Sequence, residues 1–147
     1  MKAVRRGRNV TRRRRANNKD MNYIEGLRVL IVEDELMVAI FLEDALQERG
    51  CVIAGVAGHA DEARSIIESN GLDAAILDVN LDGRRSFGLA RLLREKNVPV
   101  IFATGYGLAG VPEEFAAVPV LTKPFTEEQM ANLLAQVTGR DRTGSSC

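Results

Sequence analysis

The stretch Ala74-Ala75-Ile76-Leu77-Asp78-Val79-Asn80-Leu81-Asp82-Gly83 decides the fold of this chain. It begins as a short apolar run, which is typical of a buried strand, and ends in a turn rich in Asn, Asp and Gly. Asp78 stands where the apolar run stops. In open α/β sheets, ligands bind at the carboxyl ends of the strands. The stretch therefore predicts a carboxylate at a ligand-binding edge.

The segments on either side alternate between strand-like apolar runs and amphipathic helices. Strands are expected over residues 27–32, 51–57, 72–78, 99–103 and 118–121, and helices over residues 36–49, 60–69, 86–96 and 126–137. In the last helix, Thr126 and Gln129 have the spacing of a capping box. Such alternation indicates an α/β fold with a parallel sheet covered by helices on both faces.

The segment 105–112 interrupts this regular pattern. It holds three Gly and one Pro where the alternation calls for a helix. Each Gly costs about 1 kcal/mol relative to Ala in a helix interior. We therefore expect a short, frayed or displaced helix there.

Composition sets the class of protein. The chain has 147 residues, enough for one domain, with 46% hydrophobic residues and no Trp. Its apolar runs are too short to span a membrane, and no secretory signal follows the basic N-terminus. The two cysteines, Cys51 and Cys147, make no disulfide framework. These features favour a cytoplasmic protein.

The formal net charge of zero hides two oppositely charged parts. Residues 1–20 hold nine of the 20 Lys and Arg and one of the 20 acids, so the remainder is acidic. We expect residues 1–22 to be a disordered basic tail. Such a tail either binds nucleic acid or another anionic surface, or is a solvated extension preceding an alternative start at Met21; we favour the second interpretation. We expect residues 139–147 to be a flexible tail, with no output domain.

Polar residues follow four of the expected strands. Glu33-Asp34 comes after the first, Asp78 after the third, Thr104 after the fourth and Lys123 after the fifth. In a parallel sheet these ends share one edge, so the carboxylates repel each other unless a cation such as Mg²⁺ relieves them. A metal and an ammonium together neutralise the charge on phosphoryl oxygens, and a hydroxyl donates a hydrogen bond to one of them. Asp78 is then free to act as the nucleophile. The residue types therefore favour phosphoryl transfer to aspartate.

This set of residues, with Lys123 followed by Pro124, resembles the CheY-like receiver domain of two-component response regulators over residues 27–138. The resemblance implies a (βα)₅ flavodoxin-like fold, a three-layer sandwich with strand order 2-1-3-4-5. Asp78 would be the phosphoacceptor, and Thr104 and Lys123 would hold the phosphoryl group. Mg²⁺ would be bound by Asp34 directly, by Glu33 largely through water, by Asp78, and by the backbone carbonyl of Asn80. The Lys123–Pro124 peptide bond would be cis.

The stretch 99–106, Pro-Val-Ile-Phe-Ala-Thr-Gly-Tyr, also resembles the FAT GUY subgroup of bacterial receivers, which often stand alone. Receivers usually carry Tyr or Phe three residues before the lysine, where this chain has Val120. We therefore expect Tyr106 and the glycine-rich segment 105–110 to take over the switching role, ordering when Thr104 engages the phosphate.

Several residues have simpler explanations. Asp82 is explained by turn chemistry beside Gly83. Arg84-Arg85 is interpreted as the solvated start of a helix, with contact to a partner as the alternative. His59 has no second His or Cys at ligand spacing, which argues against a metal role. For Phe87, Leu108 and Phe115, core packing is the default and a partner-binding surface the alternative.

The sequence thus predicts a single-domain response regulator and not a turnover enzyme. It would receive its phosphoryl group from a histidine kinase or a histidine phosphotransfer protein. Output would be protein contact through the segment 105–115, the fifth strand and the last helix, with no DNA-binding domain and no membrane contact; homodimer formation is left open, and nucleic-acid binding driven by the arginine tail is a rival function. The alternatives are a phosphate sink or relay intermediate, a degenerate receiver used only for binding, and a haloacid-dehalogenase-like phosphatase. Against the phosphatase, the acidic pair precedes the nucleophile and Asn80 replaces the second Asp.

Overall fold

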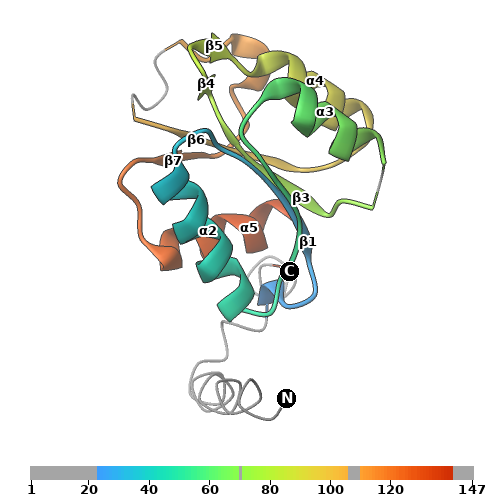
Figure 1. Cartoon of the computed structure of the whole chain (residues 1–147). Helices are drawn as coiled ribbons and strands as arrows, with labels where there is room; N and C mark the ends of the chain where they lie inside the picture. The colour runs from blue at the N-terminus through green and yellow to red at the C-terminus, as the bar shows by residue number, and fades with distance from the viewer. Residues whose placement is uncertain (1–22, 70, 106–109, 141–147) are drawn as a thin grey trace.

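The computed structural model describes residues 23–69, 71–105 and 110–140. Strands and helices alternate along the chain (Figure 1). The elements are β1 (Arg28–Val32), α2 (Leu36–Glu48), β2 (Val52–Ala57), α3 (Ala60–Glu68), β3 (Ala74–Asp78), β4 (Asn80–Leu81), β5 (Arg84–Arg85), α4 (Phe87–Glu95), β6 (Val100–Thr104), the 3₁₀ helix η2 (Glu113–Phe115), β7 (Val120–Thr122) and α5 (Glu127–Val137).

The main sheet is parallel and has the order β2-β1-β3-β6-β7. Counting these strands along the chain gives 2-1-3-4-5, so the predicted topology is confirmed. Helices α2 and α5 cover one face, and α3 and α4 cover the other (Figure 1). All five residues of the central strand β3 are buried, as its apolar run predicts for a strand covered on both faces.

The start of α5 and the end of α2 are capped as expected. The Thr126 hydroxyl accepts a hydrogen bond from the Gln129 amide at 3.0 Å, and the Gln129 side chain accepts one from the Thr126 amide at 2.9 Å. This is the predicted capping box at the start of α5. At the end of α2, Gly50 has φ +87°, a conformation that suits Gly because it has no Cβ.

The turn after β3 corrects one expectation. Asp82 and Gly83 have φ values of +53° and +79°, which suit the tight turn of a two-residue hairpin. This turn joins β4 and β5 into a small antiparallel pair, with Asn80 opposite Arg85. Arg84 and Arg85 are therefore strand residues, not the start of a helix, and α4 begins at Phe87. Two residues on each side of an Asp-Gly turn are too few to show strand alternation in the sequence.

The glycine-rich segment is only partly described, because residues 106–109, including Tyr106 and Leu108, lie outside the described residues. The helix described in this part of the chain is the short η2, which starts after Pro112. A short, frayed or displaced helix was expected over residues 105–112, and η2 is short and lies just beyond that segment. The fifth strand of the main sheet also starts later than expected, at Val120.

The packed unit extends beyond the expected residues 27–138. Ile24 lies in the core, only 1% exposed, and the Arg140 guanidinium donates a hydrogen bond to the Glu25 carbonyl at 3.2 Å. Residues 1–22 and 141–147 are outside the described part of the chain. Within the described part, we find no helix with the length and apolar character needed to cross a membrane.

Candidate functional site

The candidate site lies at the carboxyl edge of the main sheet. Asp78 ends β3 and Thr104 ends β6, while Glu33 directly follows β1 and Lys123 directly follows β7. Because these strands are parallel and β1-β3-β6-β7 are consecutive in the sheet, the four side chains reach one edge. An open hollow of about 390 Å³ lies there, lined by Asp34, Glu35, Asp78, Asn80, Gly83, Thr104, Gly105 and Lys123.

The Lys123 ammonium is the centre of this arrangement. Its Nζ lies 3.3 Å from Oδ2 of Asp78, 3.2 Å from Oε1 of Glu33 and 3.0 Å from Oε1 of Glu35. One cation thus faces three carboxylates. Burial alone would lower the pKa of Lys123, but the hydrogen bond to Glu35 and the charges of Glu33 and Asp78 outweigh it, so the pKa lies above its ordinary value.

Asp78 is buried and oriented by its own loop. The carboxylate is 5% exposed as a residue, and its Oδ1 accepts a hydrogen bond from the Asn80 amide at 3.1 Å. The Ser86 hydroxyl donates to the Asp78 carbonyl. These contacts hold both ends of the residue, which leaves Oδ2 facing Lys123. The sequence did not single out Ser86 for this positioning contact.

Glu33 is a buried acid with incomplete partners. Burial raises the pKa of Glu33 to about 7, and the neighbouring Asp78 carboxyl adds to the rise, while the Lys123 ammonium opposes it. Within the described residues, the Oε1 atom of Glu33 has no hydrogen-bond partner, because Lys123 is close but not oriented for a hydrogen bond. Lys123 thus gives this oxygen a nearby charge at 3.2 Å but no hydrogen bond, so the oxygen can take a proton or a metal ion.

The donor set fits a hard divalent cation. One carboxylate oxygen each from Glu33, Glu35 and Asp78 can be chosen so that all three lie within 4.8 Å of one another. Carboxylate oxygens with open positions for water are the ligands that Mg²⁺ prefers. The unsatisfied Oε1 of Glu33 is the observation that supports this fit.

Asp34 and Glu35 differ from the sequence-based expectation. Asp34 lines the hollow but is exposed, and its Oδ2 accepts a hydrogen bond from the Asp82 amide at 2.8 Å. Glu35, to which the sequence assigned no role, turns back instead, with its amide donating to Glu33 at 3.1 Å. The run of three acids from Glu33 was a signal for its involvement, but the loop conformation alone shows which acid meets Lys123.

The remaining expected residues are placed as follows. The Lys123–Pro124 peptide bond is cis, as the resemblance implied. Val120 is half-buried in β7 and packs against the core under α3 and α4. Thr104 is buried and lines the hollow. Cys51 is also buried, donating to the Ile24 carbonyl, and burial raises the pKa of its thiol to about 12, which makes it a poor nucleophile.

Comparison with known proteins agrees with this geometry. The family described as the response regulator receiver domain matches residues 29–135. SdrG from Sphingomonas melonis has a solved structure similar to this one, with a TM-score of 0.70, 40% identity, and coverage of 76% of this chain and 96% of that one. The response regulator PhyR from Brucella abortus has a TM-score of 0.71 and 25% identity, covering 86% of this chain and 54% of that one.

Among curated proteins, the transcriptional regulatory protein TcrA of Mycobacterium tuberculosis is 32% identical over 124 residues, covering 80% of this chain and 48% of TcrA. The transcriptional regulatory protein PdtaR of the same species is 29% identical over 119 residues, with coverage of 78% and 58%. The chain thus spans about half the length of these relatives. The matched residues include the whole carboxyl edge of the sheet, and the chain belongs to the response regulator receiver domain family.

Proposed function

We propose that this receiver accepts a phosphoryl group on Asp78 from a phosphorylated histidine of a sensor kinase or histidine phosphotransfer protein. It acts as a phosphoacceptor in a two-component phosphorelay rather than as a turnover enzyme, and its compartment is the cytoplasm. The observation that carries the proposal is the position of Asp78. Its Oδ1 is held by the Asn80 amide, and its Oδ2 lies 3.3 Å from the Lys123 ammonium.

The chemical step is a displacement at phosphorus. A carboxylate oxygen of Asp78 attacks the phosphorus, the bond between phosphorus and the donor imidazole nitrogen breaks, and the freed imidazole takes up a proton. The product is an acyl phosphate on Asp78. Water later attacks the same phosphorus, which returns the carboxylate and releases inorganic phosphate.

The surrounding side chains stabilise the charge that the phosphoryl oxygens carry. Lys123, which faces carboxylates in the resting arrangement, supplies an ammonium to one oxygen, and the Thr104 hydroxyl donates a hydrogen bond to another. We keep Glu33, Asp34, Asp78 and the Asn80 carbonyl as the residues that would hold Mg²⁺, although Glu35 and not Asp34 lies with Glu33 and Asp78 in the structure. When bound, the ion supplies positive charge to the phosphoryl oxygens. Glu35 competes for Lys123 before the phosphoryl group arrives, since its Oε1 lies 3.0 Å from Nζ.

The switching residues belong to the same proposal. Val120 replaces the usual aromatic residue of β7, so we assign the response to the segment 105–110 and Tyr106. Thr104, at the end of β6, connects the phosphoryl site to this segment. Amide exchange over residues 104–112 should slow when a phosphate mimic such as beryllofluoride binds. Identical exchange with and without the mimic would remove this part of the proposal.

Output is proposed to be protein contact through residues 105–115, β7 and α5. A phosphate sink or relay intermediate without a downstream target is the second candidate. A pull-down with the phosphorylated and the unphosphorylated chain separates these two functions. A protein that binds only the phosphorylated form supports output by protein contact.

The experiment that tests the function is intact-protein mass after incubation with acetyl phosphate and Mg²⁺. Wild type should gain one phosphoryl group, and Asp78→Asn should gain none. Asp82→Asn is the matched control, because it removes a carboxylate four residues away at a positive φ that Asn also tolerates. The gain should disappear when Mg²⁺ is removed with a chelator.

Other outcomes point to other functions. An adduct that persists in Asp78→Asn would place the phosphoacceptor elsewhere. No adduct with the donor left intact would favour a receiver used only for binding. Sustained hydrolysis of an unrelated ester such as p-nitrophenyl phosphate would favour the phosphatase.

A further inference from the structure

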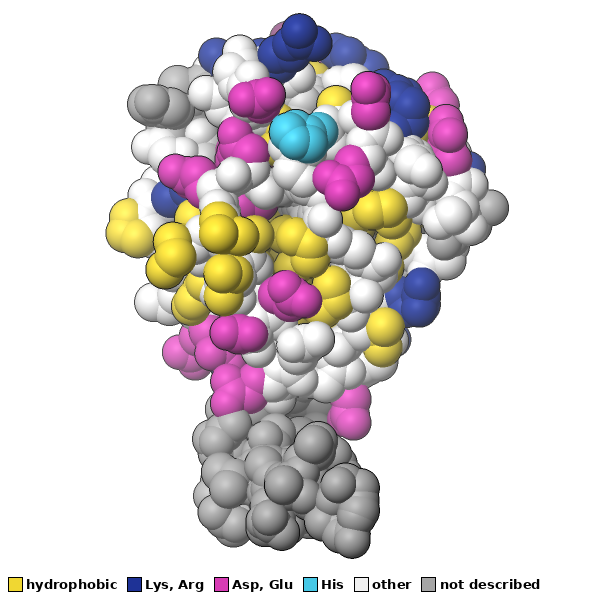
Figure 2. All heavy atoms as spheres, viewed as in Figure 1, with side chains coloured by type: hydrophobic (Ala, Val, Ile, Leu, Met, Phe, Trp, Pro, Cys, Tyr) yellow, Lys and Arg dark blue, Asp and Glu magenta, His cyan; other side chains and the backbone are white. Residues whose placement is uncertain are grey.

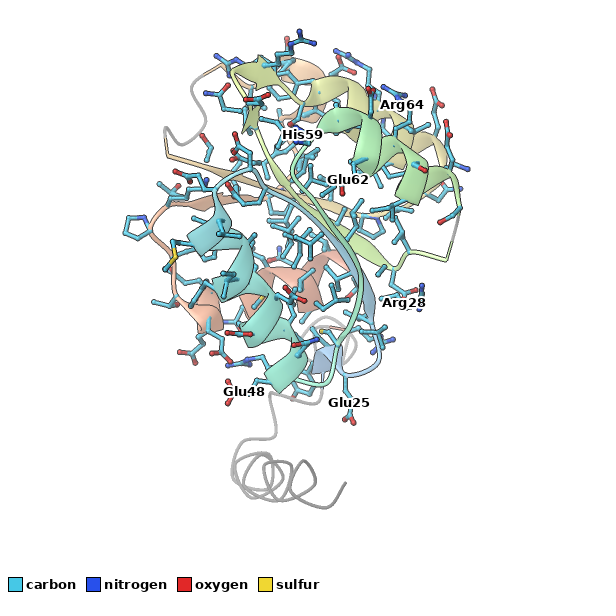
Figure 3. All side chains as sticks on the ribbon, viewed as in Figure 1. Glu25, Arg28, Glu48, His59, Glu62 and Arg64 are labelled. Carbon is cyan, nitrogen blue, oxygen red and sulfur yellow. The ribbon has the colours of Figure 1, made fainter. Side chains whose placement is uncertain are left out.

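A second hollow lies beside the β4–β5 hairpin, away from the carboxylates that surround Lys123. It is an open space of about 510 Å³ between the starts of α3 and α4 and the hairpin. The residues that carry the argument are His59 and Arg64 from the α3 side, and Arg84 and Arg85 from β5. Figure 3 shows His59 at the start of α3 and Arg64 further along the same helix.

The arginines of this hollow differ from the other arginines of the domain. Elsewhere in the described residues, each guanidinium has an assigned partner: Arg28 donates to the Gly71 carbonyl, Arg49 to Glu127, Arg91 and Arg94 to Glu114, and Arg140 to the Glu25 carbonyl. Arg64, Arg84 and Arg85 have no hydrogen bond or ion pair within the described part of the chain. The three arginines without a partner thus all line one hollow as residues, and the guanidinium group of Arg85 also lies beside Gly110.

Two helix N-termini lie beside the hollow, although the first turn of α3 already carries two acids, Asp61 and Glu62. The helix α3 starts after His59 and α4 starts after Ser86, and neither cap residue makes a side-chain hydrogen bond to its helix. The Ser86 hydroxyl is turned toward the Asp78 and Val79 carbonyls, to which it donates, and accepts no hydrogen bond from the amides of α4. The first amides of a helix favour an anion when no side chain satisfies them. Both helix starts contribute residues to the lining of the hollow.

The hairpin end of the domain is basic, although the domain as a whole is acidic. The part of the chain after residue 20 carries 11 Lys and Arg against 19 acids. Figure 2 nevertheless shows Lys and Arg side chains gathered at the upper end of the molecule, over the hairpin and α4. Asp61 and Asp82 also line the hollow, so its positive charge is interrupted. Asp61 and Asp82 repel any anion, and flexible Asp or Glu side chains can place their carboxylates at the arginines one by one, whereas backbone phosphates keep a fixed spacing.

We propose that this hollow is a docking site for an acidic segment of a partner protein, whose Asp or Glu side chains pair with Arg64, Arg84 and Arg85. Guanidinium groups bind carboxylates through two parallel hydrogen bonds, which gives the site geometric selectivity as well as charge. The site does not require Asp78 to be phosphorylated, so it stands or falls independently of the proposed phosphoryl transfer.

The test is an NMR titration of the ¹⁵N-labelled full chain with a hexaglutamate peptide, with hexaglutamine as the uncharged control. Amide shifts should concentrate in residues 59–64 and 84–89. Arg84→Gln/Arg85→Gln should weaken binding about tenfold, as loss of charge-paired contacts does. Arg91→Gln/Arg94→Gln removes the same charge from arginines already paired with Glu114 and should leave the affinity within about twofold, since these groups do not line the hollow. Arg64→Gln alone should give a smaller loss than the hairpin double variant.

Three results would overturn the proposal. Shifts confined to the basic residues 1–20 would mean that the peptide binds there instead. Equal losses in the two double variants would mean that only net charge matters. Tighter binding of inorganic phosphate or of a DNA duplex to the same amides would assign the hollow to phosphate groups and not to an acidic protein segment.

Discussion

The two faces of the sheet bury their apolar residues in different ways. Under α3 and α4, the rings of Phe87, Phe102 and Phe115 form a cluster with centroids 5.6 to 5.8 Å apart. Edge-to-face and offset contacts at this spacing are favourable beyond the area they bury. In the described residues, neither α3 nor α4 exposes a large hydrophobic side chain. This face is closed.

Charged side chains complete the closure. The guanidinium carbon of Arg94 lies 4.9 Å from the centre of the Phe115 ring, and that of Arg91 lies 5.7 Å away. Both arginines pair with Glu114, at 2.8 and 2.7 Å. The aromatic cluster is therefore covered by cations that have a partner of their own, and α4 is joined to η2.

The side of the molecule covered by α2 and α5 also has a buried core, but the outer surface of α2 is open by comparison. Helix α2 leaves Leu36 and Met37 71% and 76% exposed, and Ile40 and Phe41 more than two-fifths exposed. Figure 2 shows hydrophobic side chains gathered over this helix. Leu36 follows Glu35, whose carboxylate pairs with Lys123, so this apolar patch borders the candidate site. Leu36 and Met37 in particular are left largely unburied by folding, and contiguous exposed apolar groups mark contact sites. The side of α3 and α4 thus contributes mainly to stability, whereas the outer surface of α2 is available to a partner.

The largest effect should come from the closed face. Phe102→Ala removes a fully buried ring that contacts Phe87 and Phe115. We expect a loss of about 3–5 kcal/mol in the free energy of unfolding, measured by urea denaturation, because the cavity cannot close around the remaining rings.

Phe41→Ala is the matched change on the open face. Its ring is partly exposed and has one aromatic neighbour, Phe125, at 5.9 Å. We expect a cost of about 1 kcal/mol. Equal costs for the two substitutions would show that the faces do not differ in the way described.

The open face should matter for the protein donor. Met37→Asp should slow phosphoryl transfer by about tenfold or more from a histidine phosphotransfer protein that wild type accepts as a donor, equivalent to about 1.4 kcal/mol. Transfer from acetyl phosphate should not change, because that donor needs no protein contact. Stability should stay within about 0.5 kcal/mol, since Met37 is exposed.

The control for this prediction is Val52→Asp, which places the same charge on another exposed apolar residue, at the start of β2. It should leave both donors unaffected. If both substitutions slow transfer equally, added negative charge and not the apolar patch is responsible.

The smallest effect should come from the charged cover of the closed face. Hydrogen bonds from Arg91 and Arg94 lower the pKa of Glu114 to about 2 from its usual 4.5. A carboxyl whose pKa is lowered by folding stabilises the protein at pH values above its pKa in the unfolded state. This contribution is lost as the pH falls toward the pKa in the folded state. Wild type should therefore exceed Glu114→Gln in melting temperature near neutral pH, with the difference vanishing between pH 4.5 and 2.

This difference should be small, because the pair is exposed to solvent. Glu113→Gln, on the same turn, is the control and should show no such pH-dependent difference from wild type. A Glu114→Gln difference that persists at pH 2 would mean that the side chain acts through packing and not through its charge.

Much of the fold was predictable because its signals are local. The apolar run before Asp78 specified a buried strand, and the Thr126 and Gln129 spacing specified the start of α5. The β4–β5 hairpin was missed because its strands are too short to show alternation. The position of η2 was left open. Gly and Pro residues indicate where a helix is unfavourable, but not where the next helix begins.

The site was predictable only in part. The order of polar residues after the strands was enough to bring Glu33, Asp78, Thr104 and Lys123 to one edge, because strand direction fixes which end of each segment faces the others. The sequence did not assign Glu35 to Lys123. That pairing depends on the conformation of one loop and on which carboxylate turns inward.

The sequence by itself therefore determined the alternation of strands and helices, the parallel sheet and the polar edge at its carboxyl end, since these follow from residue periodicity and chain direction. The tertiary structure alone decided which charged groups are paired. Glu114 satisfies two arginines and Lys123 meets three carboxylates, whereas the arginines beside the hairpin meet none in the described chain. Pairing requires side chains from distant segments to meet at hydrogen-bond distance, and no local pattern in the sequence records that distance.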